Sequence, residues 1–318
     1  MTDPILPMRV TRIARLTPRI VGITLEPPEG ISVSPVVAGA HIDVHIPAGD
    51  GLIRQYSLTS RPGTHHAYDI AVLRESQSRG GSAWLHENLS VDGILKVGAP
   101  RARFSLFEPA PHHVLIAGGI GIAPLWSFVQ RLTQIGTSWE LHYAASSGDE
   151  AAFLADIREQ AGARLKTYFP ANAQERLSLD AIAAACRSDA HVYCCGPVRM
   201  MEAFDRAFAG FPDSQRHREH FTAVAAPAAE GGFEVVLAKS GGFIHVRAGQ
   251  TILDAVRAAG ISASFSCAKG VCGMCETRVI EGIADHRDSV LTAEEQARGE
   301  TMMICCSGAK TSRLVLNL

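Results

Sequence analysis

The stretch Cys267-Ala-Lys-Gly270-Val-Cys272-Gly273-Met-Cys275 decides the fold of the C-terminal part of this 318-residue chain. A fourth cysteine, Cys305, follows after a gap of 29 residues. Gly270 and Gly273 can adopt positive φ, which allows backbone N–H groups to approach sulfur atoms closely. Packing alone would not set this spacing, so the stretch predicts a loop that wraps a bound group.

The spacing C-x4-C-x2-C with a distant fourth cysteine is that of plant-type ferredoxins, in which four thiolates hold a [2Fe–2S] cluster. It predicts Cys267, Cys272, Cys275 and Cys305 as the ligands. A structural zinc site would normally pair two C-x2-C knuckles, or one such knuckle with a His pair, and this chain has a single C-x2-C pair. The 29-residue gap favours Cys305 over its neighbour Cys306, which we interpret as a small buried residue. A cluster of this kind moves one electron at a time, so we expect electron transfer.

Length and charge narrow the remaining possibilities. A chain of 318 residues fits two or three domains rather than one core. Its net charge of −2 argues against a nucleic-acid partner. The sequence has neither the pattern of a signal peptide nor a long apolar run, so we expect a cytoplasmic protein with reduced thiols and no membrane association.

A phosphate-binding pattern lies in the middle of the chain. The apolar run 114–117 predicts a buried strand, and the glycine turn Gly118-Gly119-Ile-Gly121 follows it. Pro124 suits the first turn of the next helix. A strand, a glycine turn and a helix N-terminus together form a phosphate-binding device. A tight turn in any α/β unit is the alternative for this motif by itself.

Alternating elements after that turn predict a doubly wound α/β domain with a parallel sheet. We expect strands at 140–145, 164–169 and 190–195, and helices at 151–160, 179–186 and 200–209. Ligands of such sheets bind beyond the carboxyl ends of the strands. Gly118–Gly121 and Cys195-Gly196-Pro197 should therefore share one rim. The side chain of Cys194 should face away from that of Cys195 and pack in the core.

Residues 1–108 contain short strand-like segments broken by Pro and Gly, which predict a small antiparallel barrel. Arg54 and Tyr56 would share one face of a strand, where arginine can bind a phosphate and tyrosine can cover a flat ring. Gly80-Gly81-Ser82 predicts a helix start with Ser82 as N-cap and free N–H groups for a phosphate. Each fragment alone also fits a surface hairpin or an ordinary helix cap.

The stretch 223–232 is rich in Ala and Gly without periodicity and predicts a linker. The expected division is a barrel at 1–108, an α/β domain at 109–224, a linker at 225–232 and a cluster domain at 233–318.

In order and content, these motifs resemble the ferredoxin–NADP reductase superfamily and, more narrowly, the phthalate dioxygenase reductase family with its vanillate demethylase reductases. The resemblance implies an antiparallel β-barrel flavin domain, a doubly wound α/β nucleotide domain and a C-terminal β-grasp ferredoxin domain. It also implies a monomeric enzyme that passes electrons from NADH through FMN to the cluster, and then to a partner Rieske-type oxygenase that acts on an aromatic or similar substrate.

The resemblance also implies roles for individual residues. Ser57 would lie near the reactive nitrogen of the flavin, Cys195 near the hydride path, and Phe221 over the flavin until nicotinamide displaces it. The remaining flavin contacts would be Arg54, Tyr56, Val72, Leu73, Arg74, Gly80, Gly81 and Ser82. The dinucleotide contacts would be Gly118, Gly119, Gly121, Pro124, Ser146, Gly196 and Pro197.

Relatives often carry an arginine after the second strand of the nucleotide domain, whereas this chain has Ala-Ser-Ser-Gly-Asp at 145–149. No basic residue stands there to pair with a 2′-phosphate, which favours NADH over NADPH. Alternatives are a stand-alone flavin reductase or NADH oxidase, a non-enzymatic electron carrier, and a cluster-bearing redox sensor. For an oxygenase partner, we expect docking around the cluster loop near Lys269 and Met274.

Overall fold

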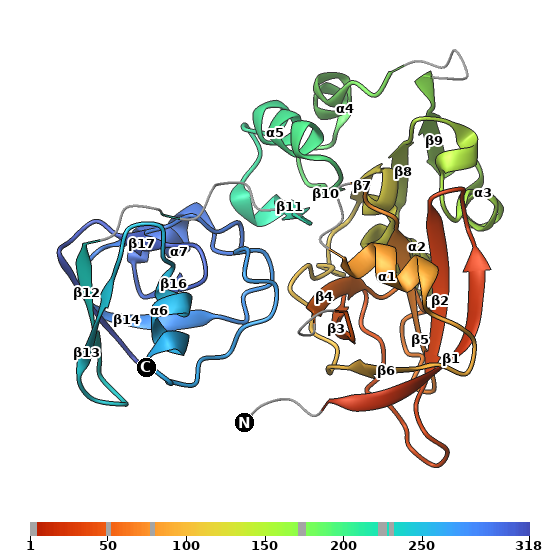
Figure 1. Cartoon of the computed structure of the whole chain (residues 1–318). Coiled ribbons are helices and arrows are strands. Elements are labelled where there is room, and N and C mark those ends of the chain that lie inside the picture. Colours follow the sequence, from red (N-terminus) through yellow and green to blue (C-terminus); the bar gives the residue numbers. More distant parts are fainter. Residues whose placement is uncertain (1–4, 49–51, 77–79, 171–175, 222–227, 229–231) are drawn as a thin grey trace. The chain divides into compact units, whose positions relative to one another are not determined.

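A computed structural model describes residues 5–48, 52–76, 80–170, 176–221, 228 and 232–318 (Figure 1). The chain forms two compact units, of which the first ends at Glu219 and the second begins at His220. The first unit contains a barrel and a parallel sheet, and the second contains a mixed sheet around the cysteine loop.

The barrel is an antiparallel sheet in the order β4-β3-β6-β1-β2-β5. An isolated bridge between Leu58 and Ile70 joins the ends of β4 and β5, which closes the sheet. Met8, Val10 and Ile42 are among the fully buried side chains that fill it. The expected antiparallel barrel is confirmed. Its strands are β1 Leu6–Arg15, β2 Ile20–Glu26, β3 His41–Ile46, β4 Leu52–Ser57, β5 Tyr68–Leu73 and β6 Ile94–Val97, with helix α1 at Gly81–Glu87.

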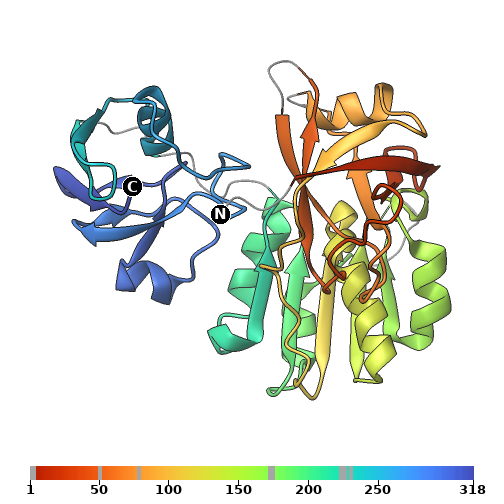
Figure 2. The same cartoon turned by 90° about the horizontal axis from the view of Figure 1, so that it is seen from below.

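The parallel sheet has the order β11-β10-β7-β8-β9, with helices on both faces (Figure 2, yellow to green). The apolar sides of α2 and α3 pack on one face and those of α4 and α5 on the other. The strand order reverses between β7 and β10, and this is where such sheets bind ligands. The elements are β7 His113–Gly118, β8 Trp139–Ala144, β9 Leu165–Tyr168, β10 His191–Cys195, β11 Arg216–Glu219, α2 Ile122–Ile135, α3 Leu154–Ala161, α4 Leu179–Ala185 and α5 Val198–Ala207.

The doubly wound domain is as expected, with each predicted element present within a few residues. Strand β11 is an exception, because sequence reasoning missed it. Its sequence Arg-His-Arg-Glu has no apolar residue, and four polar residues carry no strand signal. Pairing with β10 from Val192 to Cys195 forms this edge strand.

The barrel packs directly on helix α2. The Ser127 hydroxyl accepts a hydrogen bond from the backbone N–H of Gly39 at 2.8 Å, and the side-chain amide of Gln130 donates to the carbonyl of Thr59 at 3.1 Å. A Cβ on Gly39 would lie 1.9 Å from the carbonyl oxygen of Phe104, so the backbone segments at Gly39 and Phe104 approach too closely for any side chain at Gly39. These contacts hold the barrel and the parallel sheet together in one unit.

The second unit is a mixed sheet in the order β13-β12-β18-β14-β16, with α6 packed in its core. Strands β12 and β18 pair in parallel and the others are antiparallel. The cysteine loop connects α6 to β14. The elements of the second unit are β12 Phe233–Leu237, β13 Phe243–Val246, α6 Ile252–Ala258, β14 Glu276–Glu281, β15 Ala284–Asp285, α7 Ala293–Arg298, β16 Thr301–Met303, β17 Gly308–Ala309 and β18 Arg313–Leu316.

The predicted linker at 223–232 lies outside the described residues, except for Ala228 and Gly232. Among the described residues, no helix is both long and apolar enough to cross a membrane.

Candidate functional site

The four predicted cluster ligands are buried side chains gathered around one loop. Cys267, Cys272, Cys275 and Cys305 are at most 8% exposed. The backbone N–H of Gly270 donates to Cys305 Sγ at 3.2 Å, which joins the distant cysteine to the loop. Within the loop, the N–H of Lys269 donates to Cys267 Sγ at 3.3 Å. Such N–H groups tune an iron–sulfur cluster by stabilising the charge on its sulfurs.

The two glycines of this loop have the positive φ that the sequence predicts, 71° at Gly270 and 70° at Gly273. A Cβ on Gly270 would lie 2.5 Å from Cys306 Sγ, so the loop also presses on the neighbour of Cys305. The Cys306 thiol lies 3.7 Å from the carbonyl oxygen of Met303. Cys306 therefore has a packed environment of its own, while Cys305 Sγ accepts from the loop.

The donor set fits a binuclear cluster. In the described part of the chain, no three His, Cys, Asp or Glu side chains are grouped as ligands of one metal ion. A [2Fe–2S] cluster places two protein ligands on each iron. Four buried thiols with backbone N–H groups directed at their sulfurs suit that group.

In the barrel, the structure brings the two predicted phosphate motifs together. A Cβ on Gly81 would lie 3.0 Å from Cγ and 3.2 Å from Nε of Arg54, so the arginine side chain lies over the glycine turn. Gly80 is the N-cap of α1 with φ of 97°. The expectation that Ser82 is the N-cap is wrong. Ser82 lies inside the first turn, and its hydroxyl accepts from the N–H of Glu75 at 3.2 Å.

The strand predicted beside the flavin is β5, next to α1. The ring Nε2 of His86 lies 2.9 Å from the carbonyl oxygen of Val72 and ties β5 to this helix. Arg74 forms an exposed ion pair with Glu87, also on α1. Leu73 packs against the core shared with the parallel sheet.

The two predicted nucleotide turns meet at the reversal of strand order. A Cβ on Gly121 would lie 2.1 Å from the carbonyl oxygen of Cys195, and one on Gly196 would lie 3.2 Å from Gly118 Cα. Pro197 is the N-cap of α5. The expected shared rim is thus present, and glycine is required for its close approach. Pro124 lies in the first turn of α2, as predicted, while Ser146 is exposed in the bend after β8.

Cys194 and Cys195 face opposite sides of the sheet, as the sequence predicts. Cys194 Sγ lies 3.8 Å from Met201 Sδ in the core beneath α4 and α5. Cys195 belongs to the core on the other face, where burial, with smaller effects of Glu219 and Cys194, raises the pKa of its thiol well above its usual value. Cys195 is therefore a protonated, neutral thiol.

Glu219 is the residue of this site that sequence reasoning missed. It lies opposite Cys195 in the β10–β11 pairing, and it is hydrogen-bonded to Ser57 at the end of β4. Burial raises the pKa of Glu219 to about 8, against the lowering effect of the Ser57 hydrogen bond. Its Oε2 atom is buried without a hydrogen-bond partner among the described residues. A buried carboxyl with a raised pKa and an unsatisfied oxygen is a candidate functional residue.

Glu219 thus joins the predicted flavin residue Ser57 to the predicted hydride-path residue Cys195. The sequence around Glu219 is entirely polar and gave no sign of a buried strand, so only the fold reveals that its carboxyl is buried. Phe221, the predicted flavin cover, belongs to the second unit, and its side chain is 39% exposed.

The sequences of two segments match known families. Residues 235–310 match the 2Fe-2S iron-sulfur cluster binding domain, and residues 115–206 match the oxidoreductase NAD-binding domain. Over nearly the whole chain, phenoxybenzoate dioxygenase subunit beta of Ectopseudomonas oleovorans is 49% identical across 98% of this chain and 97% of that protein. Tetrachlorobenzoquinone reductase of Sphingobium chlorophenolicum is 43% identical across 100% of both.

Two solved structures are also similar along the whole chain. Phthalate dioxygenase reductase, described as a modular structure for electron transfer from pyridine nucleotides to [2Fe-2S], has a TM-score of 0.73 and 32% identity over 99% of this chain and 98% of its own. An intact type IV self-sufficient cytochrome P450 monooxygenase has a TM-score of 0.90 and 39% identity over 99% of this chain. This chain spans 41% of the length of that monooxygenase.

The fold and the sites define an iron–sulfur oxidoreductase with a nicotinamide-dinucleotide domain. Within that class, the chain belongs to the phthalate dioxygenase reductase family.

Proposed function

We propose that this chain is the NADH-dependent reductase component of a Rieske-type oxygenase system. The observation that carries the proposal is full-length similarity to a dioxygenase subunit and to phthalate dioxygenase reductase, with the nucleotide and cluster families matched in the same chain. The partner performs the chemistry on its own substrate, and this chain supplies the electrons. We further propose a cytoplasmic monomer with domains at 1–108, 109–224 and 233–318.

FMN is the proposed link between the two-electron donor and the one-electron cluster, because a flavin can accept a hydride and release electrons singly. Arg54 and the turn Gly80–Ser82 would bind its phosphate, and Tyr56 with Val72, Leu73 and Arg74 would border its ring. Support comes from the packing of Arg54 over Gly81, where an added Cβ would lie 3.0 Å from Cγ of the arginine, closer than most side-chain contacts.

Two residues at the junction of barrel and sheet, Glu219 and Cys195, would keep the site neutral for the arriving hydride. The Glu219 carboxyl, with its pKa raised to about 8, is protonated at pH 7, and the Cys195 thiol is protonated as well. A hydride carries negative charge, so neutral neighbours in a buried site favour its transfer. The hydrogen bond with Ser57 lowers the pKa of Glu219, but burial has the larger effect.

NADH is the proposed donor, bound with its pyrophosphate at Gly118, Gly119, Gly121 and Pro124 and its nicotinamide beside Cys195–Pro197. The bend after β8, with Ser146 and Asp149, carries no basic residue for a 2′-phosphate. An acidic residue after this strand is typical of sites that read the ribose hydroxyls.

An anaerobic titration with NADH and, in parallel, NADPH tests the proposal. We expect NADH to bleach flavin and cluster absorbance together and NADPH to act much more weakly. In Cys272→Ser, cytochrome c reduction should collapse while ferricyanide reduction by the flavin survives. Equal loss of both activities would contradict the proposed order of electron carriers.

The quinone reductase among the relatives motivates a second candidate, direct reduction of a small quinone. In that case tetrachlorobenzoquinone would be reduced by NADH without any protein partner, and turnover would survive in Cys272→Ser if the flavin is the donor. The same variant therefore separates the two functions.

A further inference from the structure

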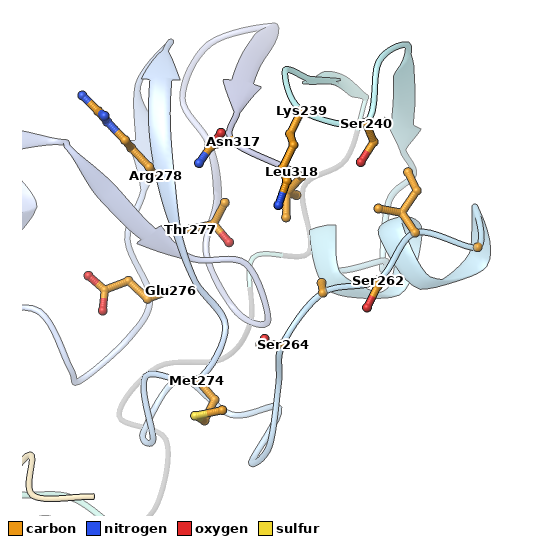
Figure 3. A pocket seen from close by; sticks show the side chains of 13 residues that line it. Lys239, Ser240, Ser262, Ser264, Met274, Glu276, Thr277, Arg278, Asn317 and Leu318 are labelled. Carbon is orange, nitrogen blue, oxygen red and sulfur yellow. The ribbon is translucent and has the colours of Figure 1, made fainter. Parts of the chain in front are cut away.

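Two hollows in the described part of the chain differ in how clearly their linings select a ligand. A groove of about 640 Å³ in the second unit runs beside the cysteine loop (Figure 3). Its lining holds both Lys239 and Glu276, and the side chain of Arg278 points away from it. The groove therefore favours no charge on an occupant. The hollow in the first unit carries a more specific signal.

The hollow of the first unit, of about 460 Å³, lies between the barrel and the parallel sheet. The barrel contributes the end of β1 and the turn to β2, with Arg15, Leu16 and Pro18 (Figure 1). The parallel sheet contributes the bend after β8, with Asp149. Both segments belong to one compact unit. The volume lies within the about 300–1,000 Å³ that is typical of small-molecule sites.

One side chain connects this hollow to the predicted pyrophosphate turn. The hydroxyl of Tyr143, on β8, lies 3.4 Å from the carbonyl oxygen of Gly119 and 3.3 Å from that of Ala152. Gly119 belongs to the glycine turn, and Ala152 follows Ala151, which lines the hollow. A dinucleotide with its pyrophosphate at the glycine turn can therefore place its adenosine end in the hollow. An acidic residue after the second strand of such a sheet reads the ribose hydroxyls, and Asp149 stands there.

The barrel turn that carries Arg15 is held in place by hydrogen bonds. The hydroxyl oxygen of buried Thr17 accepts from the backbone N–H groups of Arg19 and Ile20, at 3.2 and 3.0 Å. The backbone N–H of Arg74 donates to the carbonyl oxygen of Arg19 at 2.8 Å, which ties the turn to the end of β5. The position of Arg15 beside the hollow is therefore set by the fold of the barrel.

Arg15 and Asp149 are an unpaired cation and an unpaired anion at the same hollow. Both are exposed, and among the described residues neither side chain forms an ion pair or a hydrogen bond. A guanidinium can stack on a flat base, and Leu16, Pro18 and Ala151 add apolar lining that suits a purine. An aspartate accepts hydrogen bonds from ribose hydroxyls but repels a phosphate.

We propose that this hollow receives the adenosine end of the nicotinamide dinucleotide and that Arg15, a residue of the barrel, contacts the adenine there. Asp149 accepts hydrogen bonds from the ribose hydroxyls and keeps out a 2′-phosphate, so the two residues together set the preference for NADH. The inference rests on the proposed function and adds a specificity residue from outside the parallel sheet. Once the charge of Asp149 is removed, Arg15 becomes a partner for a 2′-phosphate.

The test uses the full chain with FMN and cluster, and two probes that lack nicotinamide, AMP and 2′,5′-ADP. These nucleotides differ only in the 2′-phosphate, so calorimetry measures binding at the hollow without any hydride transfer. The wild type should bind AMP more tightly than 2′,5′-ADP. Arg15→Gln should raise the Kd for AMP and the KM for NADH by about threefold to tenfold, because the adenine loses its contact with the cation.

Asp149→Asn separates the effects of the two charges. It should strengthen binding of 2′,5′-ADP by about tenfold or more, since the repulsion is removed and an arginine–phosphate pair can form. In Asp149→Asn/Arg15→Gln this gain should be lost. Such dependence of one substitution on the other reports a direct coupling that a general loss of structure would not produce.

The matched controls remove exposed charges of the same two elements outside the hollow. Arg12→Gln changes an arginine on β1, and Glu159→Gln changes a carboxylate on α3. Both variants should keep the Kd for AMP and for 2′,5′-ADP within about twofold, because exposed single charges contribute little.

Equal Kd values for AMP in the wild type, Arg15→Gln and Arg12→Gln would overturn the proposal while leaving the proposed function intact. A gain in 2′,5′-ADP binding that persists in the double variant would also overturn it. Tighter wild-type binding of 2′,5′-ADP than of AMP would contradict both the role of Asp149 and NADH as the preferred donor. A wild type that binds neither nucleotide and is not reduced by NADH would contradict the proposed function and this site together.

Discussion

Ser57 and Glu219 are hydrogen-bonded to each other across the junction of the barrel and the parallel sheet. They lie 162 positions apart in the sequence, at the ends of β4 and β11. Glu219 is buried, and Cys195 is its neighbour on the adjoining strand. This contact joins the residues proposed to serve the flavin with those proposed to serve the nicotinamide.

Substitution Glu219→Gln should remove a pH dependence of activity. In the wild type, the Glu219 carboxyl ionises as the pH rises through about 8, and the new charge opposes hydride arrival. NADH-dependent ferricyanide reduction should therefore fall above that pH, whereas Glu219→Gln should lack this limb. A pH profile of kcat measures it, and identical profiles for both proteins would contradict the role of Glu219.

The same substitution should also weaken the pH dependence of the free energy of unfolding. The pKa of Glu219 is raised from 4.5 to about 8, so between these values the folded protein holds a proton that the unfolded chain has lost. The free energy of unfolding thus falls with rising pH, by up to about 1.4 kcal/mol per pH unit. Denaturant titrations at several pH values from 5 to 8 measure this free energy. It should fall less steeply with pH in Glu219→Gln than in the wild type.

Gly121→Ala should disrupt the nucleotide rim. Gly121 has an ordinary φ of −60°, so the added Cβ is excluded by close contacts alone: it would lie 2.1 Å from the carbonyl oxygen of Cys195 and 2.8 Å from the backbone nitrogen of Gly196. We expect a loss of about 3 kcal/mol in stability and a raised KM for NADH. The control Gly136→Ala has φ of 69° and open space, and should cost about 1 kcal/mol with an unchanged KM.

Arg54→Gln should weaken FMN binding by about 10- to 100-fold, since a charge-assisted hydrogen bond contributes about 1.5–3 kcal/mol. Recovery of flavin fluorescence on dilution measures the loss. Arg9→Gln removes an exposed barrel arginine that pairs with Asp92, and should retain the flavin. Similar affinities for both variants would remove Arg54 from the phosphate site.

Cys305→Ser should abolish the visible absorbance of the cluster, and Cys306→Ser should preserve it. The reason is that Cys305 Sγ accepts from the Gly270 N–H of the loop, whereas Cys306 Sγ lies near the carbonyl oxygen of Met303. Iron and sulfide content, measured together with absorbance, distinguishes a lost cluster from a bleached one. The reverse pattern would move the fourth ligand to Cys306.

The sequence alone determined the cysteine loop, the glycine turns and the order of the three folding patterns. These are local features, since spacing, positive φ and apolar periodicity act over a few residues. Gly270 and Gly273 illustrate this: their places between the cysteines predicted positive φ, and both have it. The alternating strands and helices likewise predicted the doubly wound parallel sheet, whereas its strand order is given by the structure.

Tertiary structure decided what depends on residues distant in the chain. Strand β11 exists because β10 pairs with it, and the proton on Glu219 persists because the fold withdraws its carboxyl from water beside Ser57. The role of Ser82 was misjudged because Gly80 supplies the turn, leaving the Ser82 hydroxyl to bind Glu75. Burial and strand pairing depend on contacts with residues far away in the sequence, so no short stretch of sequence displays them.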